Sequence, residues 1–232
     1  LFKKISKTLL EISGGFRITI LFAECENLME NDEETFTKFV KESSENSIPQ
    51  DSQSMSDYYI ILLNYYFHLE EDDLVETYLQ KAIEILNDTK AIELIDMLYL
   101  KTGSIYLTAK EYKKALYYHQ IAREKLESRN EEVLLSSVLA DIGMEYLNLG
   151  NYGYAMEMTR RSIDISERLR NKNLVFAYNN YASIYYSLHK YDKALEYFSL
   201  ALKVSEELQF PGLEGHIYNN IANIYSDMDN YE

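Results

Sequence analysis

The chain has few of the residues that break helices or cross-link a fold. Its 232 residues include two prolines, eight glycines, one cysteine and no tryptophan. So few helix breakers favour long helices, and the single Cys25 excludes an internal disulfide and fits a reducing compartment. No run of about 18 apolar residues occurs, so we expect no membrane-spanning helix and no membrane partner. These scarcities predict a cytoplasmic, helical protein.

Positive charge is also scarce. The chain carries 23 basic and 38 acidic residues, a formal net charge of -15. Such a surplus of negative charge repels a phosphate backbone. We therefore do not expect this chain to bind nucleic acid.

The signatures of metal, cofactor and catalytic sites are missing as well. His68, His119, His189 and His216 fall at unrelated positions, and no two are three or four residues apart, the spacing at which two imidazoles share a metal on one helix face. The sequence has no glycine-rich phosphate loop and no Gly-x-Ser-x-Gly elbow. We interpret the histidines as solvated or packed side chains and predict no metal, no cofactor and no enzyme activity.

What the sequence does have is an internal repeat. A small residue followed three positions later by tyrosine recurs at intervals of 40, 39 and 40 residues, at Gly103 and Tyr106, Gly143 and Tyr146, Ala182 and Tyr185, and Ala222 and Tyr225. Two more small residues follow at fixed distances, as Ala115 and Ala122, Ala155 and Ser162, and Ala194 and Ala201. Small side chains let two helix backbones approach, and a tyrosine fills the groove beside the contact. The period and the alternation of small and large side chains predict repeated helical hairpins.

Short breakers lie between the two helices of a hairpin. In Leu149-Gly150-Asn151, we expect Gly150 to take the left-handed conformation that ends a helix. Asn151 is then placed to cap the next helix with its side chain.

This pattern resembles the tetratricopeptide repeat. Phe198 stands where that family prefers an aromatic residue, whereas His119 and Thr159 occupy the same position in their own repeats and no proline ends a repeat. The period is longer than the roughly 34 residues usual in the family and is similar to the long variety in bacterial peptide-sensing regulators and some eukaryotic scaffold proteins. The resemblance implies an all-α fold, a right-handed superhelical α-solenoid, that holds a peptide or protein segment in its concave groove.

The repeat register predicts where each part of the solenoid lies. We expect an N-terminal helix in residues 1–15, as a cap, a remnant of an upstream domain or a foreign added segment, and a solenoid in 16–232. The solenoid is predicted to contain about five hairpins and a truncated sixth, at about 16–44, 56–87, 92–128, 131–170, 174–208 and 213–232. The sequence begins at Leu1 without an initiator methionine and Tyr231 opens a new helix, so we expect a piece of a longer protein.

A row of asparagines is the candidate binding surface. It lies on the first helices, that is, on the first of the two helices in each predicted hairpin. Asn179-Asn180 and Asn219-Asn220 are 40 residues apart. An asparagine offers both a donor and an acceptor, which suits the backbone of an extended peptide whatever its sequence, and in the family that this chain resembles asparagines commonly hold ligand backbones. The predicted groove residues are Asn64, Leu100, Met144, Asn179, Asn180, Ser183, Asn219, Asn220 and Asn223, with Met97, Phe176 and Tyr186 as further apolar contacts. The alternative is that these asparagines bond to neighbouring backbone or to each other within the stack.

Three functions are compatible with these features. The first is a non-catalytic, regulatory or signalling module that binds a peptide or protein segment. The second is the ligand-sensing domain of a bacterial transcriptional regulator that responds to oligopeptides. The third is an input or scaffold segment of a multidomain signalling enzyme such as a histidine kinase. Repeat stacks with incomplete ends also self-associate, so the sequence is compatible with a homodimer as well.

A clamp for a terminal carboxylate is disfavoured. Some members of the family hold such a group with lysines and arginines on the first helices. Here those helices carry mainly Lys101 and His216.

Overall fold

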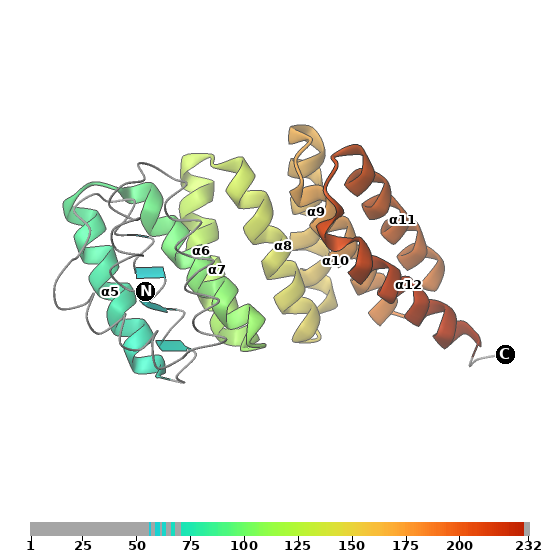
Figure 1. Ribbon diagram of the computed structural model, residues 1–232, viewed down its shortest axis with the longest axis horizontal. Coiled ribbons are helices and arrows are strands. Elements are labelled where there is room, and N and C mark those ends of the chain that lie inside the picture. Colours follow the sequence, from blue (N-terminus) through green and yellow to red (C-terminus); the bar gives the residue numbers. More distant parts are fainter. Residues whose placement is uncertain (1–55, 57–58, 61, 64–65, 68–70, 230–232) are drawn as a thin grey trace, which may run out of the picture. The chain divides into compact units, whose positions relative to one another are not determined.

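The described part of the chain is helical throughout. The computed structural model describes residues 56, 59–60, 62–63, 66–67 and 71–229 (Figure 1). In these residues the all-α prediction is confirmed, and none of the helices is long and apolar enough to cross a membrane. The predicted N-terminal helix, 1–15, and the first hairpin, 16–44, lie outside the described residues.

The chain forms eight α-helices within residues 72–229. They are α5 (Asp72–Asp88), α6 (Ile92–Thr108), α7 (Tyr112–Arg129), α8 (Glu132–Asn148), α9 (Tyr152–Leu169), α10 (Asn173–Ser187), α11 (Tyr191–Glu207) and α12 (Glu214–Asp229). A single 3-10 turn, η1 (Pro211–Leu213), precedes α12. The connection between α11 and α12 is therefore partly helical.

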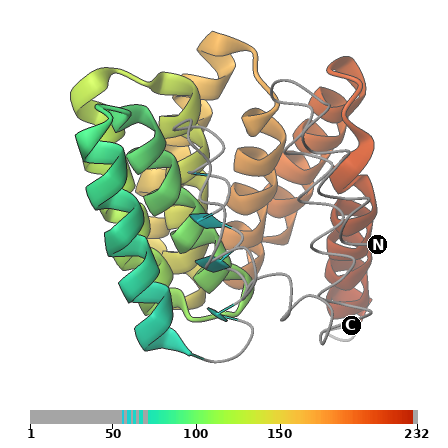
Figure 2. The same cartoon turned by 60° about the vertical axis from the view of Figure 1, so that its left-hand side comes forward.

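The chain divides into two compact units, residues 1–102 and 103–232, and the division falls within α6. In the second unit each helix packs on its neighbours in sequence: α8 lies against α7 and α9, and α10 against α9 and α11 (Figures 1 and 2). The first helices of successive hairpins are also in contact: α10 contacts both α8 and α12. This arrangement confirms a stack of helical hairpins.

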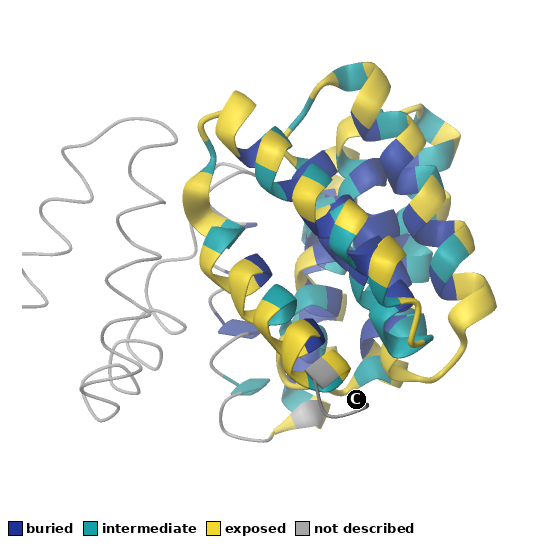
Figure 3. Ribbon diagram, turned by 90° about the vertical axis from the view of Figure 1, so that its right-hand side faces the viewer, coloured by how far each residue is buried: buried dark blue, intermediate teal, exposed yellow. Residues whose placement is uncertain are grey.

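Small residues lie where the helices of a hairpin cross. Ala115, Ala155 and Ala194 are fully buried, as are Ala122, Ser162 and Ala201. Figure 3 shows buried positions on the faces where the helices pack together and exposed positions on their outward faces. A methyl group in place of the Gly143 hydrogen would lie 2.1 Å from Thr159 Oγ1 and 3.3 Å from the Ala155 carbonyl oxygen. At Gly103 the same methyl group would lie 2.3 Å from Cδ2 of His119. The backbones therefore approach as closely as the small residues predict.

The repeat tyrosines fill the space beside these crossings. In the second unit, Tyr106 stacks on Tyr118 with ring centroids 5.5 Å apart, and Tyr185 stacks on Tyr197 at 5.6 Å. In the first unit, Tyr66 stacks on Tyr78 at 4.8 Å. Large and small side chains therefore alternate in the second unit, as the repeat predicts.

A buried hydrogen-bonded pair accounts for one departure from the family pattern. His119 Nδ1 lies 2.5 Å from Glu145 Oε1, and both side chains are fully buried. Burial raises the pKa of Glu145 to about 7, although its hydrogen bond with His119 acts in the opposite direction. The pair joins α7 to α8 and so links two hairpins. Of the predicted histidine environments, His119 is packed, His189 and His216 are exposed, and His68 lies outside the described residues.

Each helix from α5 to α11 is followed by a residue with left-handed backbone conformation. Gly150 has φ 75°, as predicted, and Asn151 caps α9 by accepting a hydrogen bond from the Tyr154 N–H at 3.4 Å. The other such residues are not glycines: Lys90, Lys110, Asn130, Arg170, His189 and Gln209. A backbone hydrogen bond across the turn, such as Asn151 N–H to the Tyr146 carbonyl at 2.8 Å, stabilises this conformation.

Candidate functional site

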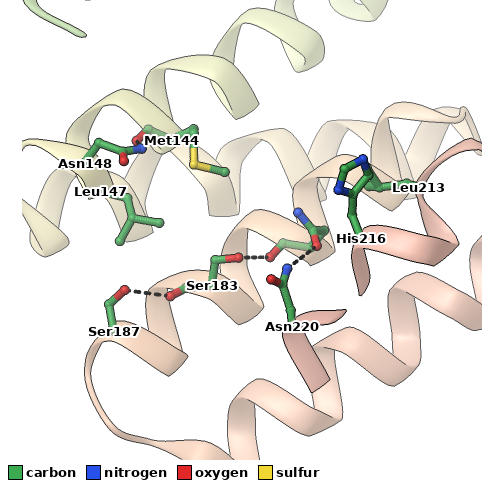
Figure 4. A pocket seen from close by; sticks show the side chains of 9 residues that line it. Met144, Leu147, Asn148, Ser183, Ser187, Leu213, His216 and Asn220 are labelled. Carbon is green, nitrogen blue, oxygen red and sulfur yellow. Dashed lines mark hydrogen bonds between the residues drawn. The ribbon is translucent and has the colours of Figure 1, made fainter. Parts of the chain in front are cut away.

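A pocket of about 660 Å³ opens on the first helices of the second unit (Figure 4). Its lining comes from α8, α10 and α12, with one residue from η1: Met144, Leu147, Asn148, Asn179, Ser183, Ser187, Leu213, His216 and Asn220. Three successive hairpins therefore each contribute their first helix to one pocket.

The repeat register explains how these side chains come together. Met144 and Ser183 share one repeat position, and Asn148 and Ser187 share the position four residues later. Residues four apart lie on the same face of a helix, one turn above the other. Side chains of α8 and α10 consequently form two parallel rows along the pocket.

The structure brings together four of the nine predicted groove residues. Met144, Asn179, Ser183 and Asn220 line the pocket. For these residues the predicted common surface on the first helices is present.

The other predicted residues lie elsewhere. Asn219 and Asn223 are exposed on α12 outside the pocket lining, and Leu100 is buried in the first unit. Asn64 lies outside the described residues. Of the additional apolar contacts, Phe176 packs against Phe210 with ring centroids 5.8 Å apart, and Tyr186 donates a hydrogen bond to Asp227.

Asn180 has a structural partner. Its side chain is buried and donates to the Ala140 carbonyl oxygen of α8 at 3.0 Å. A hydrogen bond to neighbouring backbone was the alternative to ligand binding, and it is the arrangement that Asn180 adopts. Asn180 therefore holds α10 against α8 and does not line the pocket.

A chain of side-chain amides crosses the first helices. Asn220 Nδ2 donates to Asn179 Oδ1 at 3.5 Å, and Asn179 Nδ2 donates to Asn180 Oδ1 at 3.3 Å. With the bond from Asn180 to Ala140, the chain runs from α12 through α10 to α8. It fixes the orientation of Asn220, whose Oδ1 and second N–H stay at the pocket.

Two serines present oxygen atoms to the pocket. Ser183 donates its hydroxyl to the Asn179 carbonyl at 2.9 Å, and Ser187 donates to the Ser183 carbonyl at 3.0 Å (Figure 4). Since a hydroxyl has one hydrogen, each serine can only accept a hydrogen bond from a ligand. Asn148 likewise uses one N–H on the Met144 carbonyl, at 2.8 Å.

Sequence reasoning missed five of the lining residues: Leu147, Asn148, Ser187, Leu213 and His216. The register could have indicated Asn148 and Ser187, because they lie one turn after Met144 and Ser183. Leu213 has no such signal, since it belongs to the irregular turn before α12. Among the described residues, no cluster of three histidine, cysteine or acidic side chains could hold a metal ion.

Comparison with known families decides the nature of the last hairpins. Residues 174–232 match the family described as tetratricopeptide repeat. These residues are tetratricopeptide repeats. For residues 174–232 the match confirms the family that the spacing of small residues and tyrosines predicts. This segment includes most of α10 and all of α12, two of the three helices that line the pocket. The sequence matches no curated protein.

Solved structures with the same fold extend the likeness beyond these tetratricopeptide repeats. Aspartyl phosphate phosphatase F from Bacillus subtilis is 20% identical with a TM-score of 0.67, covering 89% of this chain and 58% of that chain. A signal transduction ATPase with a tetratricopeptide repeat sensor, from Pyrococcus horikoshii, is 21% identical with a TM-score of 0.66, covering 96% and 33%. A Rap protein complexed with competence and sporulation factor is 16% identical with a TM-score of 0.61, covering 97% and 68%. At these identities the likeness shows the fold.

Proposed function

We propose that this chain is a non-catalytic module that binds an extended peptide, or a partner's peptide segment, in the pocket between α8, α10 and α12. The observation that carries the proposal is the pocket lining. Amide and hydroxyl groups from the first helices of three successive hairpins converge on one pocket and lie beside the apolar side chains of Met144, Leu147 and Leu213.

The size and chemistry of the pocket suit such a ligand. Its volume of about 660 Å³ lies within the roughly 300–1,000 Å³ typical of ligand sites. The amide of Asn220 can pair with a peptide backbone through one donor and one acceptor. Apolar neighbours add affinity by removing nonpolar ligand surface from water.

The related structures support the proposal. One of them is a Rap protein in complex with competence and sporulation factor. We infer a regulatory or signalling role, in which peptide binding alters how the repeats engage a partner. In a transcriptional regulator that responds to oligopeptides, such a module would be the ligand-sensing domain.

A second candidate function is the sensor segment of a larger signalling protein. It is favoured by the likeness to the signal transduction ATPase with a tetratricopeptide repeat sensor, of which this chain covers 33%. The same pocket would then bind the signal, and the output would lie in another domain. In the first candidate, peptide binding changes how the repeats engage a separate partner. In this candidate, it changes the activity of another domain of the same protein.

The test compares two neighbouring asparagines. Peptides that bind the 232-residue chain are selected from a random library, and their dissociation constants are measured by fluorescence anisotropy. We expect Asn220→Ala to weaken binding roughly tenfold, because it removes one or two hydrogen bonds of about 1 kcal/mol each. Asn219→Ala is the matched control, since Asn219 is exposed outside the pocket lining, and it should leave affinity unchanged.

Two results would contradict the proposal. One is the failure of any library peptide to bind the chain. The other is equal affinity of the Asn220→Ala variant and the Asn219→Ala control for every selected peptide. Ser183→Leu provides a second variant, because a leucine at this position fills part of the pocket and should block binding.

A further inference from the structure

The first helices run parallel and end at the same side of the pocket. Asn173 of α10 donates to the Val133 carbonyl of α8 at 2.9 Å, near the start of both helices. Near their ends, Asn148 is the last residue of α8 and Ser187 the last of α10, and both line the pocket. The carboxyl end of a helix carries a partial negative charge, because the dipoles of its peptide groups are aligned along the helix axis. This end of the pocket is therefore electronegative.

The first helix of the last hairpin, α12, carries a carboxylate at the equivalent repeat position. Asp227 of α12 holds the repeat position of Asn148 and Ser187. It is half-buried and accepts a hydrogen bond from the Tyr186 hydroxyl of α10 at 2.7 Å. This bond raises the pKa of Tyr186 to about 12, so the proton stays on the tyrosine. Tyr186 thus links Asp227 to α10, one residue before Ser187.

The last turns contain no compensating positive charge. None of α8, α10 and α12 has a basic residue in its last turn. In the turn after α10, Lys190 is exposed and His189 lies 3.1 Å from the Tyr191 hydroxyl. Within the pocket lining, the only side chain that can carry positive charge is His216, near the opposite end of α12.

We infer that this end of the pocket, lined by Asn148 and Ser187, binds a cationic group of the peptide ligand, an ammonium or a guanidinium, with Asp227 of the neighbouring first helix as its counter-charge. The inference rests on the proposed function and specifies the ligand's chemistry. The Ser187 hydroxyl oxygen and the Asn148 Oδ1 accept hydrogen bonds from the cation. Asp227 supplies the opposite charge, and Tyr186 acts as its positioning residue.

The test uses three matched probes on the 232-residue chain. These are the N-acetyl, N′-methylamide derivatives of arginine, citrulline and glutamate, in which citrulline keeps the shape of arginine without its charge. Binding is followed by the backbone amide resonances of Ser187 and Asp227. We expect the arginine probe to bind roughly fivefold more tightly than the citrulline probe, and the glutamate probe to bind more weakly than both.

Variants identify the groups responsible. Asp227→Asn should remove the preference for arginine over citrulline, and Tyr186→Phe should reduce it. Asp192→Asn is the matched control, because Asp192 is an exposed carboxylate in the first turn of α11, and it should leave the preference unchanged.

The outcomes separate this inference from the proposed function. Equal binding of the three probes, or an unchanged arginine preference in Asp227→Asn, would overturn the inference. The same holds if the arginine probe causes no shift, or if the selected library peptides bind without any basic residue. In that last case the proposed function stands, whereas a chain that binds no library peptide contradicts the proposed function itself.

Discussion

Gly103→Leu should destabilise the second unit by about 3 kcal/mol or more. A Cβ at this position would lie 2.3 Å from Cδ2 and 2.5 Å from Nε2 of His119. The imidazole cannot move aside without leaving Glu145, 2.5 Å from its Nδ1. Overpacking of a rigid contact costs about 1–3 kcal/mol, and a leucine adds more atoms than the contact can absorb. The free energy of unfolding is measured by urea denaturation followed by circular dichroism.

Two alanine variants give this prediction a matched control. Gly103→Ala should destabilise, because its methyl group already meets the imidazole. Gly215→Ala should stabilise by about 0.5–1 kcal/mol, since alanine is the better helix former and nothing lies within 4 Å of the added methyl group. If both alanine variants are stabilising, the close crossing of helices at Gly103 is absent.

Glu145→Ala should cost about 3–5 kcal/mol of unfolding free energy. The substitution removes the carboxylate from a fully buried pair with His119 and leaves a cavity between α7 and α8. Removing one partner of a buried hydrogen-bonded pair leaves the remaining polar group without that bond and away from water, and this loss adds to the cost of the cavity. Glu145→Gln should lose less, because the amide can still accept a hydrogen bond from the imidazole.

An exposed ion pair serves as the comparison. Glu132 accepts two hydrogen bonds from Arg168, at 2.7 and 2.8 Å, but the pair is open to solvent. Glu132→Ala should therefore have a much smaller effect than Glu145→Ala, because water screens the exposed charges. Equal losses in the two variants would mean that the pair of His119 and Glu145 does not hold the two hairpins together.

The fold could be predicted closely because one physical rule repeats along the chain. Small residues at Ala155 and Ser162 set where α9 crosses its neighbour, so the helix bounds followed from their spacing. The left-handed turns were harder to predict. Gly150 has a residue type that favours this conformation, whereas Lys110 and Arg170 do not. Lys110 and Arg170 adopt it because a backbone hydrogen bond closes each turn, from the Glu111 N–H to the Tyr106 carbonyl at 2.9 Å and from the Asn171 N–H to the Ser166 carbonyl at 3.3 Å.

The site was predicted in part, for a reason that Asn179 and Asn180 illustrate. The repeat period places both on a first helix, but adjacent residues on a helix point about 100° apart. Asn179 therefore faces the pocket and Asn180 faces α8, where the Ala140 carbonyl receives its amide. Likewise, His119 and Glu145 are 26 residues apart and their pairing leaves no mark in the repeat. Spacing determines the helix, and only packing determines the partner.

The central claim is that the first helices of successive hairpins together hold a peptide, and methionine methyl resonances test it most directly. In the chain labelled with [methyl-13C]methionine, Met144 reports on the pocket wall of α8, and Met156 reports on a half-buried position of α9, a second helix. Titration with a library-selected peptide should shift the Met144 methyl signal, give contacts between that methyl and the peptide, and leave Met156 unchanged. Peptide contacts at Met156 with an unchanged Met144 signal would contradict the claim.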